Sequence, residues 1–118
     1  MIKSYEDLEV YQKGYKLALK IHQLTQQLPK TERYELGSQM RRAAVSIPAN
    51  IAEGYGKKES SAEFRRFLLM SLGSCNELQV YVKMCKDLNY INKEIAEKLL
   101  KSYDILGRQL NTMIQKWV

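Results

Sequence analysis

The side chains best suited to binding a charged ligand form a row of lysines and glutamines in the first third of the chain. No Asp or Glu occurs from Val10 to Thr31, and the basic and amide residues within this segment recur every three or four positions, as on one face of a helix. Lysines in such a row contact the phosphates of a polyanion without reading base sequence. A basic face that is merely hydrated is the alternative. The row consists of Lys13, Lys16, Lys20, Gln23, Gln27 and Lys30.

A second group of cations surrounds the connection between the second and third expected helices. The net charge of +6 is compatible with a polyanionic partner, although net charge alone does not identify one. We expect this group to add to a nucleic-acid-binding surface, together with Lys3 and Lys116, which should reach the same end of the molecule. Its members are Arg41 and Arg42 on the second helix, and Lys57, Lys58, Arg65 and Arg66 around the connection.

Residue types that support catalysis or metal binding are too few and too scattered. His22 is the single histidine, and Cys75 and Cys85 lie ten residues apart, about 15 Å along a helix, which is too far for a disulfide. The GYGKK segment lacks the spacing of a phosphate-binding loop. We therefore expect no enzyme, no cofactor and no metal site, and two cysteines that lie in the core.

The length of 118 residues suits one domain, residues 1–118, with a single core. No uninterrupted apolar run approaches the ~20 residues of a membrane span. The N-terminus MIKSYEDLEVY contains acids and has no apolar signal core. We expect a cytoplasmic protein without a membrane partner.

Four helical segments account for the chain, at about 5–27, from 31 or 38 to 54–56, 60–87, and from 92 onward. Ser4, Ser60 and Asn92 are the expected N-terminal signals. The short connections favour an all-α fold, an antiparallel up-down-up-down four-helix bundle. Apolar residues spaced four and three apart predict one core stripe on each helix. On the fourth helix this stripe is Ile95, Leu99, Ser102, Leu106, Leu110, Met113 and Trp117.

Three of the helices carry more apolar residues than one core requires. A lone bundle would expose these extra rows to water, and large exposed apolar patches are uncommon. Gly73 and Gly107 would let another helix approach closely. We expect self-association, with a wide core face and scattered surface residues as the alternative. The expected interface comprises Tyr11 and Tyr15, then Leu69, Gly73, Val80 and Met84, then Leu100, Tyr103, Gly107 and Ile114.

The segment RRAAVSIPANIAEGYG carries a proline inside a helical pattern. Pro48 should kink the second helix, at a cost of roughly 3 kcal/mol in an ordinary helix. Ser46 and Asn50 flank it and can satisfy the freed backbone groups. A binding or interface role for this polar ladder, which continues to Glu53, is the other interpretation. Gly54 begins the GYG stop, where glycine would supply a left-handed turn.

The chain resembles the 23S rRNA-intervening-sequence proteins, small bacterial four-helix-bundle proteins, over nearly its whole length. The resemblance is carried by this proline-bearing block, by DLEVYQKGYKLALKIHQL, and by SAEFRRFLLMSLGSCNELQVYV. It implies an antiparallel bundle that assembles as a ring-like pentamer. The family name suggests ribosomal RNA as a partner, and a related bundle is an accessory subunit of a reverse transcriptase.

Two functions follow from these observations. The first is a non-enzymatic, oligomeric protein that binds structured RNA through repeated basic helix faces. The second is a protein-interaction scaffold or accessory subunit, assembled through apolar helix faces, whose partner is another protein such as a nucleic-acid-processing enzyme. A homo-oligomer is expected in both.

Overall fold

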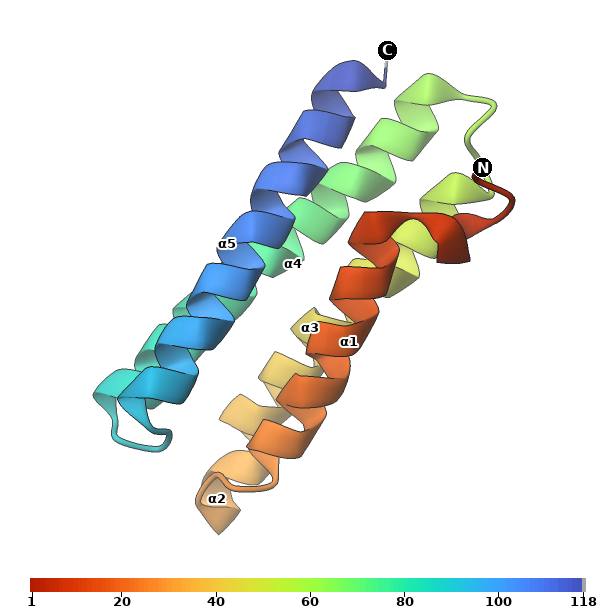
Figure 1. The fold of residues 1–118 in the computed structure, drawn as a ribbon. Helices are drawn as coiled ribbons and strands as arrows, with labels where there is room; N and C mark the ends of the chain where they lie inside the picture. The colour runs from red at the N-terminus through yellow and green to blue at the C-terminus, as the bar shows by residue number, and fades with distance from the viewer. Residues whose placement is uncertain (118) are drawn as a thin grey trace.

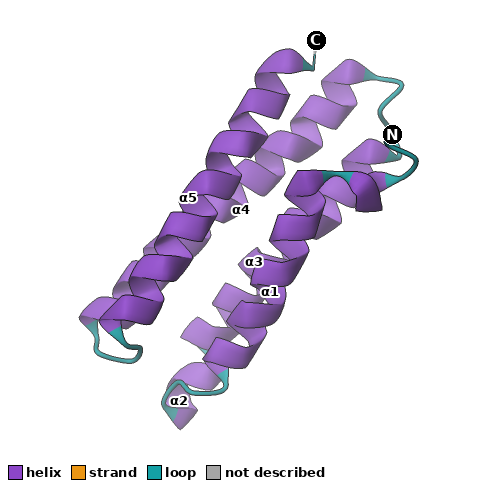
Figure 2. Cartoon of the chain, viewed as in Figure 1, coloured by secondary structure: helices purple, strands orange, loops and turns teal. Residues whose placement is uncertain are grey.

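Residues 1–117 are described by a computed structural model that has four long helices (Figures 1 and 2). No strand occurs among the described residues. This confirms the all-α class. In chain order, the elements are the 3₁₀ helix η1 (Tyr5–Asp7), α1 (Glu9–Thr25), the single turn α2 (Lys30–Arg33), α3 (Leu36–Tyr55), α4 (Ser61–Asp87) and α5 (Lys93–Lys116).

Polar side chains determine where three of these elements begin. Ser4 caps η1, Ser60 caps α4 and Asn92 caps α5, each accepting a hydrogen bond from a backbone N–H two or three residues further on. The starts expected for the third and fourth long helices are confirmed. The first expected helix is divided instead, because the extended backbone of Leu8 (φ −74°, ψ 129°) separates η1 from α1.

The glycines at the end of α3 do not form the expected left-handed turn. Gly56 has φ −65°, and no glycine within residues 1–117 has a positive φ. Gly54 is buried inside α3, where an added Cβ atom would lie 2.6 Å from the Cβ of Phe67 on α4. The glycine is therefore needed for close helix packing. A left-handed residue does occur in the turn after α4, at Asn89 (φ 61°).

The core lies between the four long helices and follows the predicted stripes on α1, α3 and α4. Both cysteines are buried free thiols, as expected. Burial raises the pKa of each thiol to about 11. Fully buried members of the core include Ile21, Met40, Ile47, Ile51, Phe64, Leu68, Leu78 and Val82.

The expected orientation of α5 is wrong in part. Tyr103, Gly107 and Ile114 were expected at an oligomer interface, yet all three are buried within this chain, and the ring of Tyr103 is fully buried. Gly107 faces α4, where an added Cβ would make ordinary van der Waals contact, at 3.6 Å, with Leu72 and Cys75 of that helix. The core side of α5 is formed by Ala96, Leu99, Tyr103, Leu106, Gly107, Leu110 and Ile114.

The long helices form an elongated molecule of 44 × 22 × 22 Å. Close packing joins α1 to α3, α3 to α4, and α4 to α5. The N-terminus, the C-terminal end of α5 and the α3–α4 connection lie at one end of the molecule, whereas α2 and the α4–α5 connection lie at the other (Figure 1). Of the four neighbouring pairs, α1 and α5 contact each other least.

Pro48 lies inside α3, which continues on both sides of it. Its ring is buried beside α1, at the position where an added Cβ on Gly14 would lie 3.5 Å from its Cδ. An added Cβ on Gly14 would come closer to Ile47, at 3.0 Å from its Cγ2, so the small residue on α1 makes room for the isoleucine next to the proline. A kink in α3 at this point stays a prediction.

The polar residues around Pro48 bond to backbone carbonyls, but not to the carbonyl of Ala44, whose helical N–H donor Pro48 removes. The Ser46 hydroxyl donates to the carbonyl of Ala43 (2.8 Å), and the Asn50 side-chain amide donates to the carbonyl of Ser46 (2.8 Å). Ser71 of α4 donates to the carbonyl of Ile47 (2.9 Å), a contact that the sequence pattern did not indicate. These bonds add donors to carbonyls of the helical turn around the proline, and the repair of the proline's own lost bond by Ser46 and Asn50 stays a prediction.

Candidate nucleic-acid interface

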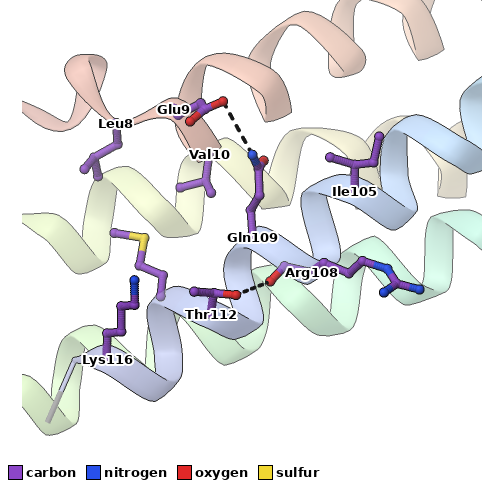
Figure 3. Close-up of a pocket in the computed structure, with 9 residues that line it drawn as sticks. Leu8, Glu9, Val10, Ile105, Arg108, Gln109, Thr112 and Lys116 are labelled. Atoms are coloured by element: carbon purple, nitrogen blue, oxygen red, sulfur yellow. Dashed lines mark hydrogen bonds between the residues drawn. The ribbon is translucent and has the colours of Figure 1, made fainter.

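A groove runs along the loosely packed boundary between α1 and α5. Three hollows of about 450, 210 and 350 Å³ follow one another along it, from the N-terminal end of α1 to its C-terminal end. Figure 3 shows the first, in which Leu8 and Val10 lie opposite Ile105 and Thr112. The groove therefore extends over most of the length of both helices.

The groove is lined by cations from both helices. The acid-free segment of α1 faces α5 across it, and α5 contributes basic side chains at either end and near the middle. One carboxylate, that of Glu9, is among the residues that line the three hollows. The lining cations are Lys13, Lys16 and Lys20 of α1, with Lys98, Arg108 and Lys116 of α5.

Ion pairs neutralise these cations only weakly. Lys13 lies 3.3 Å from Glu9, and Arg108 lies 3.0 Å from Asp104, with Lys98 in a longer contact of 4.0 Å to a carboxylate one turn away. Exposed pairs of this kind contribute about 0–1 kcal/mol. A phosphate can therefore replace the carboxylate partners at small cost.

Amide and hydroxyl groups complete the polar lining. The Gln109 side-chain amide donates across the groove to the Glu9 carboxylate (3.4 Å), and the Thr112 hydroxyl donates to the carbonyl of Arg108 (3.0 Å), as Figure 3 shows. The amide oxygen of Gln109 is buried and has no hydrogen-bond partner within residues 1–117. The floor of the groove thus offers neutral hydrogen-bonding groups between its rows of cations.

The structure brings the predicted row of α1 together with a row on α5 that sequence reasoning missed. The α1 row lines the groove from Lys13 to Gln27, whereas Lys30 lies on α2. A signal for the α5 row exists, since its members are spaced alternately four and three apart. That spacing was hard to recognise as a polar row, because the row contains Ile105 and overlaps the apolar core stripe of the same helix. The α5 row is Lys98, Ser102, Ile105, Gln109, Thr112 and Lys116.

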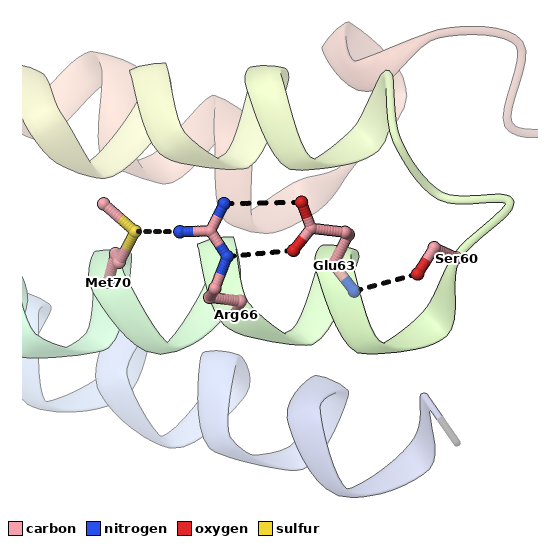
Figure 4. Close-up of polar contacts among 4 residues, drawn as sticks. All are labelled: Ser60, Glu63, Arg66 and Met70. Atoms are coloured by element: carbon pink, nitrogen blue, oxygen red, sulfur yellow. Dashed lines mark hydrogen bonds and ion pairs between the residues drawn. The ribbon is translucent and has the colours of Figure 1, made fainter.

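The cations around the α3–α4 connection pack largely against their own chain. Lys57 lies 5.0 Å from the ring centre of Phe67, and Lys58 lies 4.2 Å from that of Tyr55. Arg66 forms two hydrogen bonds with Glu63 (2.9 and 3.4 Å), which Figure 4 shows beside the Ser60 cap. None of these three cations lines the α1–α5 groove, so they form a separate basic group at the α3–α4 connection.

Two of the predicted arginines are tied to backbone and core groups. Arg41 donates to the Thr25 hydroxyl (2.9 Å) and to the carbonyl of Arg33 (3.0 Å), which fastens the α2 region to α3. Arg65 donates to the carbonyl of Ile114 (3.1 Å), near the C-terminal end of α5. These bonds give both guanidinium groups a structural role in this chain.

The remaining polar predictions lie elsewhere on the surface. Arg42 and Glu53 are exposed on α3, and Lys30 is exposed on α2, at the end of the molecule opposite the chain termini (Figure 1). None of the three lines the α1–α5 groove. The structure therefore does not join them to the main basic surface.

The apolar residues expected on the outside of α4 are exposed in the single chain. Leu69, Val80 and Met84 are 52%, 55% and 45% exposed, and Gly73 has open space where a side chain would lie. Met70, which the sequence analysis did not include, is exposed beside them. We call these five residues the α4 apolar face.

Tyr11 and Tyr15 lie apart from the α4 apolar face, on the side of α1 that faces α3. Tyr15 is exposed and Tyr11 is half-buried, while Leu100 is half-buried on α5. The residues expected to form one interface therefore occupy separate parts of the surface, and those of α5 are largely withdrawn into the core.

No group of three or more His, Cys, Asp or Glu side chains within residues 1–117 is placed to hold a metal ion. None of the helices described there has an apolar stretch long enough to cross a membrane. His22 is exposed, with its Nδ1 atom 3.1 Å from the carbonyl oxygen of Ala18.

Comparison with known proteins agrees with this fold. The chain is similar to a crystal structure from Bacteroides thetaiotaomicron VPI-5482, described as a protein with unknown function from the S23 ribosomal protein family. The similarity has a TM-score of 0.82 and 25% sequence identity, and covers 91% of this chain and 96% of that chain. No protein with a curated description matches the chain.

The sequence profile described as "23S rRNA-intervening sequence protein" matches residues 6–112, which include all four long helices except the last residues of α5. This match confirms the resemblance noted from the three sequence segments. The chain belongs to the 23S rRNA-intervening sequence protein family.

Proposed function

We propose that this protein is a non-enzymatic, oligomeric RNA-binding protein that holds structured RNA in the α1–α5 groove. The observation that carries the proposal is the convergence of six cations from two helices on one long groove. Lysine and arginine side chains arranged in this way contact phosphates and position the nucleic acid without reading its sequence. The name of the family supports ribosomal RNA as the target and the cytoplasm as the location.

We propose that each copy is an antiparallel up-down-up-down bundle, which the order of helix packing within the chain supports. Contact between copies through the α4 apolar face would remove its exposed leucine, valine and methionine side chains from water. The family resemblance implies a pentamer. Each additional copy would repeat the α1–α5 groove, so that weak phosphate contacts add up through avidity.

The proposal is tested by replacing Lys13, Lys16 and Lys20 together with glutamine. Glutamine keeps the helix and removes three positive charges from the groove, so the affinity for a structured RNA should fall by at least about tenfold at moderate salt. An electrophoretic mobility shift assay measures the change. Circular dichroism verifies that the variant is folded.

The matched control replaces three exposed or half-exposed lysines outside the groove, Lys83, Lys86 and Lys93, with glutamine. It makes the same change in net charge and should retain most of the affinity. Equal losses in the two triple variants would mean that overall charge, and not the groove, attracts the RNA.

A second candidate function is a scaffold or accessory subunit that binds another protein. The α4 apolar face favours it, because an exposed apolar surface of this kind suits a protein contact as well as self-association. A wild-type protein that binds no RNA at low salt, while its α4 apolar face captures a defined protein partner, would support this function over the first.

A further inference from the structure

A second hollow, of about 320 Å³, lies on the other side of α1, between α1 and α3. Its lining includes small residues, the buried Ala18 and the exposed Ala49 among them, together with the buried Pro48. Exposed Leu19 and Val45 stand at its sides. The hollow therefore combines apolar walls with an opening to solvent.

Three tyrosines form one edge of this hollow. The rings of Tyr5 and Tyr11 meet edge to face with centres 4.9 Å apart, and the rings of Tyr11 and Tyr15 are tilted by 32° with centres 6.0 Å apart. The first two rings support the third, which is 50% exposed. Tyr15 thus presents a held aromatic surface to solvent at the mouth of the hollow.

One cation, Lys16, adjoins this aromatic edge. Tyr11 and Tyr15 also border a further hollow, of about 360 Å³, that is lined by Glu6, Gln12 and Lys16. Lys16 belongs to the α1–α5 groove as well, so it stands between the basic groove and the aromatic edge. The Glu6 carboxylate is the one acid among the residues lining the two aromatic hollows.

We propose that the α1–α3 hollow receives an unpaired base of the RNA strand whose phosphates lie along the lysines of α1. This inference rests on the proposed function. Each nucleotide carries its phosphate and its base at different ends of a ribose. A strand whose phosphates contact the lysines on one side of α1 could therefore turn a base toward the tyrosines on the other side. Bases stack on aromatic side chains with little dependence on sequence, and only unpaired bases are free to do so.

The acid-free sequence of α1 and the position of Lys16 favour a nucleotide over a second copy of the chain as the occupant. An apolar protein surface would gain nothing from a lysine beside the aromatic edge of the hollow. A strand with phosphates would gain both the charge contact and the stacking.

The test compares single-stranded oligoadenylate with a perfect RNA duplex of the same length. Tyr15→Leu keeps an apolar side chain but removes the ring, and it should weaken binding to the single strand by about 5- to 150-fold per stacked base. Binding to the duplex should be unchanged, because no phosphate contact is lost. Tyr15→Phe should bind like the wild type, and so should Tyr34→Leu, which alters a tyrosine that is 78% exposed elsewhere.

Three results would overturn the inference. If Tyr15→Leu leaves the affinity for the single strand unchanged, this inference fails but the proposed function stands, since the groove could still bind phosphates. An altered oligomeric state in Tyr15→Leu, with RNA affinity retained, would assign the hollow to a protein contact. If the wild type binds neither RNA, the proposed function fails together with this inference.

Photo-crosslinking of the wild type provides a measurement that does not depend on the folding of a variant. A single-stranded oligonucleotide that carries 5-iodouridine should crosslink to the peptide that contains Tyr11 or Tyr15. Crosslinks confined to other peptides would contradict the proposed site.

Discussion

Gly54 allows α3 to pass so close to α4 that any larger residue must displace its neighbour. An added Cβ atom would lie 2.6 Å from the Cβ of Phe67 and 3.1 Å from the ring of Phe64, and the former is fixed to the α4 backbone. Overpacking costs about 1–3 kcal/mol, and we take the upper half of that range because the Phe67 Cβ moves only with the α4 backbone. Alanine recovers up to ~1 kcal/mol as the better helix former. Gly54→Ala should therefore destabilise the protein by about 1–2 kcal/mol.

Gly56→Ala is the matched control, two residues away. Gly56 has φ −65°, and an added Cβ would lie 3.4 Å from its nearest neighbour, so alanine fits without strain. The lower entropy of the unfolded chain should make this variant neutral or more stable by about 0.4–1 kcal/mol. The two substitutions are thus expected to change the stability in opposite directions.

Urea unfolding followed by circular dichroism measures both variants, at one fixed protein concentration because assembly would make the apparent stability depend on it. In thermal unfolding, Gly54→Ala should lower the Tm by roughly 4–8 °C. A neutral Gly54→Ala together with a destabilised Gly56→Ala would refute this reasoning. That result would mean that the GYG segment needs glycine for a left-handed turn after all.

Val80→Glu should dissociate the oligomer by light scattering while the helical circular dichroism persists, whereas Lys83→Glu should leave the assembly intact. A monomeric wild-type protein would end the assembly proposal. Asn50→Leu should lower the free energy of unfolding by about 1 kcal/mol, since it removes a bond to a backbone carbonyl beside the proline; a loss of assembly without loss of stability would indicate an interface role instead. Hydrogen bonding to Arg66 lowers the pKa of Glu63, so its stabilisation is present above its ordinary pKa and lost as the pH falls through the lowered value. Glu63→Gln should reduce the dependence of stability on pH in that acid range, and an unchanged dependence would contradict this.

Much of the fold could be predicted because the apolar spacing is regular and the capping residues are strong local signals. The core residues of α1, α3 and α4 and the starts of α4 and α5 were obtained in this way. The orientation of α5 could not be predicted, because two series of apolar residues with the same alternating spacing overlap along this helix. Ile95 appeared to continue one series but is 44% exposed, whereas Tyr103 belongs to the buried series.

Only the α1 side of the candidate site could be predicted from the sequence. The lysines of α1 share a segment without acids, which is visible in the sequence. The groove depends on which helices are neighbours and on how loosely they pack, and no local pattern encodes either property. The roles of Arg41 and Arg65 were also hidden, since their partners lie 16 and 49 residues away in the chain.

The dependence of RNA affinity on salt concentration tests phosphate binding in the α1–α5 groove most directly. If the α1–α5 groove neutralises about four phosphates of a duplex region, log affinity should fall with log salt at a slope near −3.6. The triple replacement of Lys13, Lys16 and Lys20 should make the slope shallower by about 2.7. A wild-type affinity that does not respond to salt, or an equal slope in the triple variant, would contradict phosphate binding in this groove.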